Sequence, residues 1–502
     1  MVRALIMAMP DVYQDWSPIR HFISWTGGPS IAANCPGHDV RIADLVFKRR
    51  NLREGIDEAL ARTDPQVIGF SAMTFQYLTA VQIASYIRSE HPMLAGVPFI
   101  LGGYHATCSR EQVAGSAEGK LFDFLFAGES EHTFRRFLDG FDTAGPSCYE
   151  EIPGLSYRRS DGAWRHNPLA EPINSAPGLD TLVIPDREAR LWSNGLVDTA
   201  ETSRGCNATC KFCSIRQMMP GSRFGAFDED RVIADLRRAK ARGARVIFFT
   251  DDNPAQRPVA YKSLLRRIIS EGLDDLYYSG MYSTSSMADD DLTRLMADAG
   301  VVHLFLGIEA IERDSLKLLR KGSSENLAAR AVRNLKTAGI SVMAGLILGN
   351  PDDTEESIRR TFRWCREQDV DEILAQFLTP YPGTEIRAEL LREGLVEDPD
   401  QWRTYNGMFA HCRTRSGLMP ADLEAIVYEE HSAFKRHRMA YAPELKFCDY
   451  RYNPVRDFGD NPGNSFHEKA AFARERWLKM NQFDLGRDGS ATTAVRGEEV
   501  RA

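Results

Sequence analysis

The sequence predicts an α/β protein with a doubly wound, Rossmann-like domain first, a partial barrel of six strand–helix units second, and a helical region last. Three observations predict this architecture. Short apolar runs alternate with helix-like stretches in residues 1–145 and again in residues 196–395. Between the two series, residues 146–195 are rich in Pro, Gly, Ser and charge, which is typical of a linker with room for a small hairpin. Residues 396–480 have a helical pattern and many aromatic side chains.

The first domain is predicted to be a parallel sheet covered by helices on both faces. Its candidate strands are the apolar runs VRALIMAM, DVRIADLVF, PQVIGFSAM, VPFILGG and FDFLFAG. Helix-like segments such as NLREGIDEALART and YLTAVQIASYIRSEH lie between them. This alternation is the pattern of a doubly wound fold.

The second series supplies the strands of the barrel. Its apolar runs are ARVIFFTDDN, LYYSGMYST, VHLFLGIEA, ISVMAGLILGNP and EILAQFLTPYPGT. With a strand that starts near residue 197, they make about six units, too few for a closed barrel of eight. The tail, residues 481–502, has little to bury and is expected to be disordered.

The composition is that of an ordinary globular protein. Apolar residues make up 43% of the 502 residues and charged residues 26%, and the length suggests several domains. No apolar run approaches the roughly 18–20 residues of a membrane span, and the formal charge of −8 gives no basic surface for a nucleic acid. The start MVRALIMAMPD is interpreted as a buried strand and not as an export signal. We therefore expect a cytoplasmic protein with neither a membrane nor a nucleic-acid partner.

Three of the nine cysteines, Cys206, Cys210 and Cys213, lie close together in the stretch RGCNATCKFC. Thiolates suit zinc or iron–sulfur clusters. A closed zinc site needs four ligands, usually as two separated pairs, and the sequence has no second pair downstream. Three cysteines on a four-iron cluster leave one iron with an open coordination site. Zinc and a chance grouping stay as the alternatives.

The C-x-x-x-C-x-x-C spacing, with Phe212 before the last cysteine and a strand ahead of it, resembles the radical S-adenosylmethionine (SAM) superfamily. The resemblance covers residues 197–395. It implies that Cys206, Cys210 and Cys213 hold a 4Fe-4S cluster whose open iron binds SAM. Reduction of the cluster, by an electron donor such as flavodoxin or ferredoxin, then cleaves SAM to a 5′-deoxyadenosyl radical.

The same resemblance implies a set of SAM-binding residues at the strand ends of the barrel. They are Phe212, Asp251, Asp252, Glu309, Gly345 and Gln376. The aspartates of FFTDDN stand where the family places polar groups for the SAM amino group. Glu309, in LGIEA, stands at the ribose position, although a salt bridge to Arg313 is a competing role. Gly345, in GLILGNPDD, lies on the strand that passes adenine.

Three strand ends in the first domain are candidates for a second ligand, because doubly wound sheets bind ligands at the carboxyl ends of their strands. The candidates are Ser71, Met73, Thr74, Gly102, Gly103, Tyr104, His105, Gly128 and Glu129. Paired glycines let a bulky ligand approach the backbone. FSAM and GGYHAT resemble the S-x-L and G-G elements of the cobalamin-binding domain that precedes the radical domain in one branch of the superfamily. The resemblance implies that these residues bind cobalamin.

One element of many cobalamin domains is missing. The motif D-x-H-x-x-G, whose histidine ligates cobalt, does not occur in residues 1–50. The resemblance therefore implies cobalamin bound without a protein histidine. A flavodoxin-like domain with a purely structural role stays as the alternative, and His105 can equally be an ordinary loop histidine.

The resemblance implies a cobalamin-dependent radical SAM enzyme that transfers a methyl group to an unactivated centre of a small molecule. The alternative enzyme class is a non-methylating oxidation, cyclisation or ring contraction, as in the anaerobic cyclase of magnesium-porphyrin synthesis. Two further alternatives are a methylthiotransferase acting on tRNA and a cobalamin or cluster sensor. The methylthiotransferase would need a basic RNA-binding module, which this acidic chain lacks. The sensor would need no radical-generating pocket. No catalytic acid or base is identified. Aromatic residues of the last region could line a substrate pocket, although packing in the core is the more common role of such residues: Trp402, Tyr405, His411, Tyr441 and Tyr452.

Overall fold

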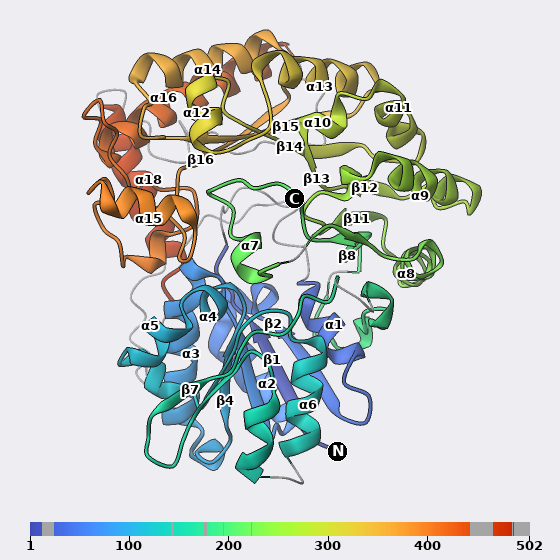
Figure 1. The fold of residues 1–502 in the computed structure, drawn as a ribbon, viewed down its shortest axis with the longest axis vertical. Coiled ribbons are helices and arrows are strands. Elements are labelled where there is room, and N and C mark those ends of the chain that lie inside the picture. Colours follow the sequence, from blue (N-terminus) through green and yellow to red (C-terminus); the bar gives the residue numbers. More distant parts are fainter. Residues whose placement is uncertain are drawn as a thin grey trace.

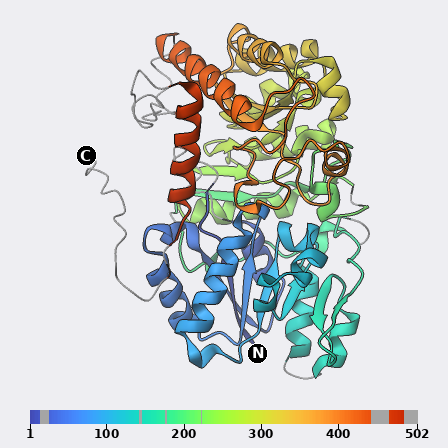
Figure 2. The ribbon, with the colours of Figure 1, turned by 90° about the vertical axis from the view of Figure 1, so that its left-hand side faces the viewer.

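The computed structural model describes residues 1–12, 25–141, 145–174, 178–193, 195–221, 223–441, 465–483 and 485. The chain forms two α/β bodies, one above the other in Figure 1, and the last helices run along one side of both (Figure 2). This is the predicted order of a doubly wound domain, a partial barrel and a helical region. Disorder was predicted for residues 481–502, but Asn481 is buried and hydrogen-bonded, so the prediction is wrong at the start of this range. Residues 486–502 lie outside the described residues, as do Cys448 and Tyr452.

The first body is built on a seven-stranded sheet in the order β2-β1-β3-β4-β5-β6-β7. Its first five strands run parallel, and the last two add to the edge as an antiparallel hairpin. The strand bounds are β1 Arg3–Ala8, β2 Asp39–Asp44, β3 Val67–Ser71, β4 Phe99–Gly102, β5 Phe124–Phe126, β6 Leu155–Arg158 and β7 Trp164–His166. The order 2-1-3-4-5 is that of a doubly wound fold, in which chain direction across the sheet switches between β1 and β3.

Alternating side chains of β1 explain why this sheet has helices on both faces. Leu5 and Met7 belong to one buried cluster, while Ala4 and Ile6 belong to another. A strand buried on both faces is typical of a parallel sheet. The covering helices are α1 Gly27–Ala33, α2 Leu52–Thr63, α3 Tyr77–Glu90, α4 Tyr104–Cys108, α5 Arg110–Gly115 and α6 Glu131–Phe141.

The second body is a parallel sheet of six strand positions that curves without closing. Its strands are β8 Val197–Ala200, β11 Val246–Phe249, β12 Tyr277–Ser279, β13 Met281–Ser283, β14 His303–Glu309, β15 Ser341–Leu348 and β16 Glu372–Phe377. β12 ends one ladder and β13 begins the next, and only Gly280 separates them in the chain. Together these two short strands fill the third position, so the order follows the sequence from β8 to β16.

Helices cover the outer face of this partial barrel. They are α8 Glu229–Ala241, α9 Pro258–Ser270, α10 Thr284–Met287, α11 Asp290–Asp298, α12 Arg313–Leu318, α13 Glu325–Thr337, α14 Glu355–Glu367 and α15 Glu385–Arg392. Several begin where a polar side chain accepts a hydrogen bond from the first turn, as Ser324 does for α13 and Thr354 for α14. Alternate strand residues such as Ile247, Leu304 and Val342 pack beneath them in one apolar core. The other alternate residues therefore face the concave side.

A buried arginine joins the linker to the barrel wall. Arg187 donates to Asp198 at 2.7 Å and to the carbonyl oxygen of Thr199 at 2.7 Å, and it also pairs with Asp235 of α8. The side chain of Arg187 is only 3% exposed. The linker is therefore fixed to β8, the strand that leads into the cysteine stretch.

The carboxyl-terminal helices connect the two bodies. α16 Pro420–Tyr441 packs on α14 of the barrel and on α18 Phe466–Met480. α18 reaches the first body, where Trp477 donates through Nε1 to the carbonyl oxygen of Val12 at 3.2 Å. Asn481, just beyond α18, accepts through Oδ1 from the backbone N–H of Val12 and from Arg49. No helix in the described ranges combines the length and apolar character needed to cross a membrane.

Candidate active site

The three cysteines lie on a loop whose two ends are joined by a short antiparallel ladder. β9 Ser203–Arg204 pairs with β10 Gly225–Ala226, and between them α7 Ile215–Met218 follows the cysteines. Halfway along the loop, Lys211 donates its backbone N–H to Leu319, accepts at its carbonyl from Ile386, and pairs with Glu389 at 2.7 Å. The loop thus spans from one side of the barrel to the other, above the carboxyl ends of the strands (Figure 1).

The donor set of this loop suits an iron–sulfur cluster. Cys206, Cys210 and Cys213 are free thiols, and among the described residues no three His, Cys, Asp or Glu side chains converge on one metal ion. Cysteines that bind three different irons of a cluster need not converge on one point. Burial raises the pKa of Cys213 to about 12, so its thiolate requires a nearby positive charge, which a bound metal supplies.

Two carboxylates at the end of β11 hold the segment that enters the loop. Asp251 is buried and accepts from the backbone N–H and hydroxyl of Thr202 and from the hydroxyl of Ser203. Asp252 accepts through Oδ2 from the backbone N–H of Gly205 at 2.9 Å. Burial raises the pKa of Asp251 to about 7 and that of Asp252 to about 6. Both predicted SAM residues therefore bind the chain's own backbone beside the first cysteine.

The next residue, Asn253, was missed by the sequence analysis. It is 8% exposed, and its Oδ1 accepts no hydrogen bond from any described residue. A buried acceptor without a donor is rare in folded proteins, and here it lies at a strand end next to the cysteine loop. An amino group of a bound ligand would satisfy it, so this position fits SAM. The sequence signal was the polar triplet at residues 251–253, from which only the two acids were chosen.

Glu309 ends β14 in an unusual backbone conformation and pairs with Lys321. Its φ is 67°, in the left-handed region, and the ladder to β15 shifts register there. Lys321 donates through Nζ to Oε1 of Glu309 at 2.9 Å, and both side chains are largely buried. The partner is therefore Lys321 and not Arg313. A Cβ at Gly307 would lie 2.7 Å from Oε1 of Glu309, so glycine there makes room for the pair.

Lys321 also places its charge beside the cysteines. Burial raises the pKa of Cys210, and the Lys321 ammonium opposes that shift. One cation therefore faces both the predicted ribose-binding carboxylate and the thiols. Lys321 could not be predicted from the sequence, because a β-bulge and a helix separate it from Glu309, twelve residues earlier.

The remaining predicted SAM residues lie along the concave side of the barrel. The ring of Phe305 covers Gly345, since a Cβ there would come within 2.0 Å of the phenyl Cζ. Gln376 lies against Gly407, whose added Cβ would be 2.8 Å from Nε2 of Gln376. Phe212 packs with the apolar cluster that includes Ile347. The structure brings the cysteines, Asp252 and Glu309 together, while Gly345 and Gln376 already have protein neighbours.

In the first body, the two glycines at the carboxyl end of β4 have different surroundings. Gly103 has a φ of 89°, and a Cβ there would lie 2.9 Å from the carbonyl oxygen of Ala72 and 3.1 Å from the hydroxyl of Ser71. Gly103 is therefore required by its own neighbours. A Cβ at Gly102 would meet no described atom nearer than 3.9 Å. A Cβ at Gly102 would make only ordinary van der Waals contacts with Phe126 and Phe70, so there is room over this residue for part of a ligand.

The other candidates of this domain line the same carboxyl edge. Met73 donates its backbone N–H to Gln76, and Thr74 is buried. Gly128 donates its backbone N–H to the hydroxyl of Thr107 at 3.0 Å. Tyr104 begins α4, the helix that contacts α7 of the cysteine loop. The strand ends thus face the loop, as Figure 1 shows.

His105 is buried among aromatic rings. It stacks on Tyr77 at 4.3 Å between ring centroids, and Trp402 contacts it edge-on at 5.4 Å. Neither ring nitrogen bonds to any described residue, and burial lowers the pKa of His105 to about 3. The imidazole is therefore neutral and packs as an apolar group. Tyr405 and His411, candidates for the substrate pocket, are likewise buried, at 0% and 2% exposed.

Glu129 is engaged across the junction between the two bodies. Its Oε2 accepts from the backbone N–H of Ile173 at 2.7 Å, and its Oε1 accepts from Arg204 at 3.1 Å. Arg204 stands two residues before the first cysteine. This contact between a strand end of the first body and the start of the cysteine loop was not foreseen from sequence.

Two protein-family models match the chain. The B12 binding domain matches residues 26–138, and the Radical SAM superfamily matches residues 200–365. The first match covers β2 to β5 of the doubly wound body, and the second covers the cysteine loop with most of the barrel.

The chain also resembles whole proteins from several organisms. It is 26% identical to an uncharacterized methyltransferase of Pyrococcus horikoshii over 80% of this chain and 86% of that protein. It is 25% identical to an anaerobic magnesium-protoporphyrin IX monomethyl ester cyclase of Rubrivivax gelatinosus, over 73% and 68%. Its fold resembles the structure of the radical S-adenosylmethionine methyltransferase TsrM from Kitasatospora setae, solved with cobalamin and a 4Fe-4S cluster, with a TM-score of 0.65 and 18% identity over 96% and 100% of the two chains.

Replacing Cys206, Cys210 and Cys213 together by Ala is expected to remove the cluster without unfolding the chain. Anaerobically purified wild-type protein should be brown and contain about four irons per chain. Iron analysis measures the loss, and circular dichroism checks the fold. Cys365→Ala is the control, because Cys365 is buried in the barrel core and its loss should leave iron unchanged. Full iron content in the triple variant would contradict the assignment.

Replacing Gly102 by Val is expected to abolish retention of cobalamin while the fold is kept, because the new methyl groups enter the open space over the strand end. Gly103→Val is a poor test, since its left-handed φ and its contact with Ala72 disturb the loop itself. Gly96→Val is the control, because a Cβ there meets no described atom within 4 Å and Gly96 lies before β4, at its amino end. The absorption spectrum after reconstitution and desalting decides. Equal cobalamin in wild type and Gly102→Val would refute the prediction.

Replacing Glu309 by Gln is expected to weaken SAM binding roughly ten-fold or more, because a charge-assisted hydrogen bond contributes about 1.5–3 kcal/mol. The same change leaves the Lys321 ammonium buried without its partner, so thermal stability falls as well. The double variant Glu309→Gln/Lys321→Met removes both charges and should recover stability but not affinity. Calorimetric titration with SAM is the measurement. Wild-type affinity in Glu309→Gln, together with lowered stability, would reduce the role of Glu309 to the ion pair.

Proposed function

We propose that this chain, which belongs to the radical SAM superfamily and carries a B12-binding domain ahead of its radical SAM domain, transfers a methyl group from SAM to an unactivated centre of a small molecule. The observation that carries the proposal is the pairing of the two domains in one chain, with their carboxyl strand ends facing each other across α7 (Figure 1). A relative over most of the chain is named a methyltransferase.

The chain offers a distinct set of residues to each cofactor. Cys206, Cys210 and Cys213 would hold the cluster, and the edge that carries Asn253 and Glu309 would hold SAM. The space over Gly102 would hold part of cobalamin. When bound, the reduced cluster supplies the electron that cleaves SAM, and cobalamin supplies a carrier for the methyl group.

The residues of the chain would bind the ligands, orient them and shield the reacting groups from water. Lys321 balances the Glu309 carboxylate at the mouth of the barrel, so a polar ligand meets a nearly neutral pair there. Phe305 and Met343, neighbours on β14 and β15, alternate with core residues and so present apolar side chains to the concave side. The first body covers the opposite side, so that reacting groups are held near each other and away from water.

A reducing compartment and a protein electron donor complete the proposal. Among the described residues, no disulfide joins any of the cysteines Cys35, Cys108, Cys148, Cys206, Cys210, Cys213, Cys365 and Cys412. Free, buried thiols are typical of cytoplasmic proteins. A cytoplasmic flavodoxin or ferredoxin would supply the electron that reduces the cluster.

A second candidate function is a non-methylating ring closure. It is favoured by the likeness to a protein named as a magnesium-protoporphyrin cyclase, which spans 73% of this chain. The cofactors would be the same, and the difference lies in whether the methyl group of SAM ends in the product.

Incubating the reduced holoenzyme with methyl-labelled SAM and a candidate substrate separates the two functions. Methyl transfer should consume two SAM molecules per product, one giving 5′-deoxyadenosine and methionine and the other giving S-adenosylhomocysteine. Label in the product, with both nucleosides in equal amounts, is the expected result. Deoxyadenosine with an unlabelled product and no stoichiometric S-adenosylhomocysteine would reject methyl transfer and leave ring closure.

A further inference from the structure

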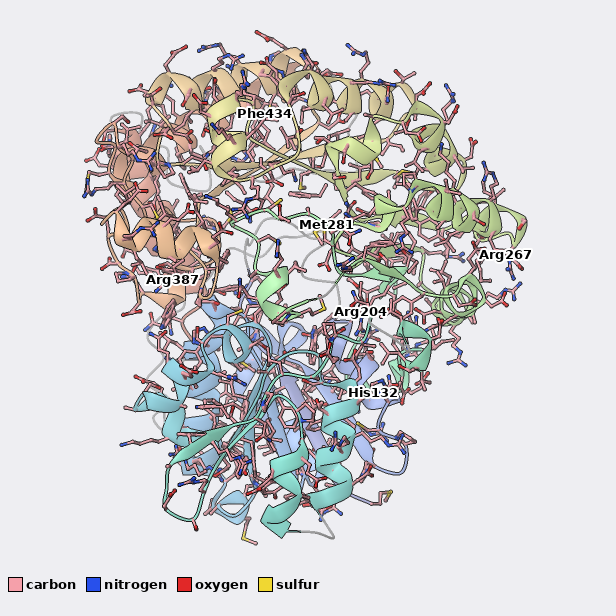
Figure 3. All side chains as sticks on the ribbon, in the orientation of Figure 1. His132, Arg204, Arg267, Met281, Arg387 and Phe434 are labelled. Atoms are coloured by element: carbon pink, nitrogen blue, oxygen red, sulfur yellow. The ribbon has the colours of Figure 1, made fainter. Side chains whose placement is uncertain are left out.

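Arg204 lies at the junction of the two bodies, directly before the cysteine loop (Figure 3). Its guanidinium contacts three carboxylates at once. It donates to both oxygens of Glu201, at 3.0 and 2.9 Å, and to Glu129 at 3.1 Å. It also pairs with Glu131 at 2.7 Å. The side chains of Arg204 and its three partners are between 6% and 14% exposed.

The three carboxylates come from both bodies. Glu201 follows β8 of the barrel, whereas Glu129 follows β5 of the first body and Glu131 begins α6. Glu131 accepts a further bond from the hydroxyl of Ser30 in α1 at 2.9 Å. Only a planar guanidinium with five N–H donors can satisfy partners in so many directions.

The linker joins the same network. The backbone N–H of Ile173 donates to Glu129, and Asn174 donates through Nδ2 to the carbonyl oxygen of Arg204 at 3.2 Å. Arg204 is also paired through its backbone with Gly225 in the ladder that joins the ends of the cysteine loop. Both bodies therefore meet at the Arg204 side chain, and the linker is bonded to its backbone at the start of that loop.

Such a network fixes geometry more than it adds stability. Buried ion pairs contribute little net free energy compared with apolar contacts of the same size, because desolvation opposes the attraction. Their hydrogen bonds are directional and weaken steeply when donor and acceptor move out of line. A junction held in this way keeps one spacing between the two bodies.

We propose that Arg204 is a positioning residue that sets the distance between the cobalamin-binding edge of the first body and the cluster loop. The proposal rests on the proposed function, since the distance matters only where both cofactors take part in one reaction. Arg204 touches neither cofactor in this account. It acts through Glu129 and Glu131 on one side and through the cysteine loop on the other.

The test measures the distance between the two metals without turnover. Holoenzyme reconstituted with cluster and hydroxocobalamin is partly reduced, and the magnetic coupling between the reduced cluster and cob(II)alamin is recorded by electron paramagnetic resonance. Wild type should give one defined coupling. Arg204→Lys keeps the charge but loses the planar guanidinium with its several N–H donors. This variant should retain iron and cobalamin, while the magnetic coupling between the two metals shifts or becomes heterogeneous. Its methyl transfer per deoxyadenosine should fall by up to about 100-fold, the loss that a misplacement of roughly 1 Å can cause.

Arg187→Lys is the matched control. The side chain of Arg187 is more buried than that of Arg204, at 3% against 11% exposed, and it contacts two carboxylates that both belong to the barrel. It should lower thermal stability and leave the metal–metal coupling unchanged. Wild-type coupling and product ratio in Arg204→Lys would overturn the proposal, and so would an equal change in Arg187→Lys.

A second variant covers the case in which Arg204→Lys does not fold. Glu129→Gln keeps an acceptor oxygen but removes one charge from the first body's side of the network, and the coupling should shift there too. Unchanged coupling in Glu129→Gln would then overturn the proposal. A wild-type enzyme that binds both cofactors with one defined coupling, yet transfers no methyl group, would contradict the proposed function while the geometric role of Arg204 is still decided by the variants.

Discussion

The hydrogen bonds that Asp251 and Asp252 accept determine where the cysteine loop begins. The two carboxylates follow β11 and accept hydrogen bonds from backbone N–H groups on either side of β9. The donors are Thr202, just before β9, and Gly205, just after it. A buried donor left unpaired would cost about 1–3 kcal/mol, so this segment has one favourable position. The start of the cysteine loop is therefore held in one position, and the backbone hydrogen bonds of Lys211 hold the loop again halfway along. Any cluster held there inherits both constraints.

The mouth of the barrel combines strain with charge. Glu309 adopts a left-handed backbone at a β-bulge, a conformation that costs about 1–3 kcal/mol for a residue other than glycine. Lys321 pairs with the carboxylate that this conformation positions, and the absence of a side chain at Gly307 leaves space for the pair. Strain of this kind persists where geometry serves function, and here it turns a carboxylate toward the thiols. The ammonium beside them makes the edge suitable for a ligand that carries both an amino and a carboxylate group.

Patterns close together in the sequence predicted the architecture and the cysteine triplet, because each is a local property. Strand alternation gave both sheets, and the spacing of Cys206 to Cys213 indicated the metal chemistry. Contacts between residues that are not neighbours in the sequence could not be predicted from such local patterns. Lys321 and Glu309 meet only across a bulge, and Arg204 and Glu129 meet only when the two bodies are in place.

The glycines show the same limit. Sequence favoured both Gly102 and Gly103 as ligand contacts, but the left-handed φ of Gly103 and its closeness to Ala72 could be recognised only from coordinates. His105 was open to two readings, and its burial between Tyr77 and Trp402 follows from a segment about 300 residues away in the chain.

The junction between the two bodies is held by directional bonds at separate places. Arg204 joins the cysteine loop to the strand ends of the first body, while Trp477 and Asn481 join the last helix to Val12 beyond β1. Apolar surfaces alone tolerate sliding, since their attraction depends on area and not on angle. Hydrogen bonds and ion pairs with defined acceptors remove that freedom. Two cofactors carried on two different sheets can react with one substrate only if the sheets keep their spacing, and these contacts supply that constraint.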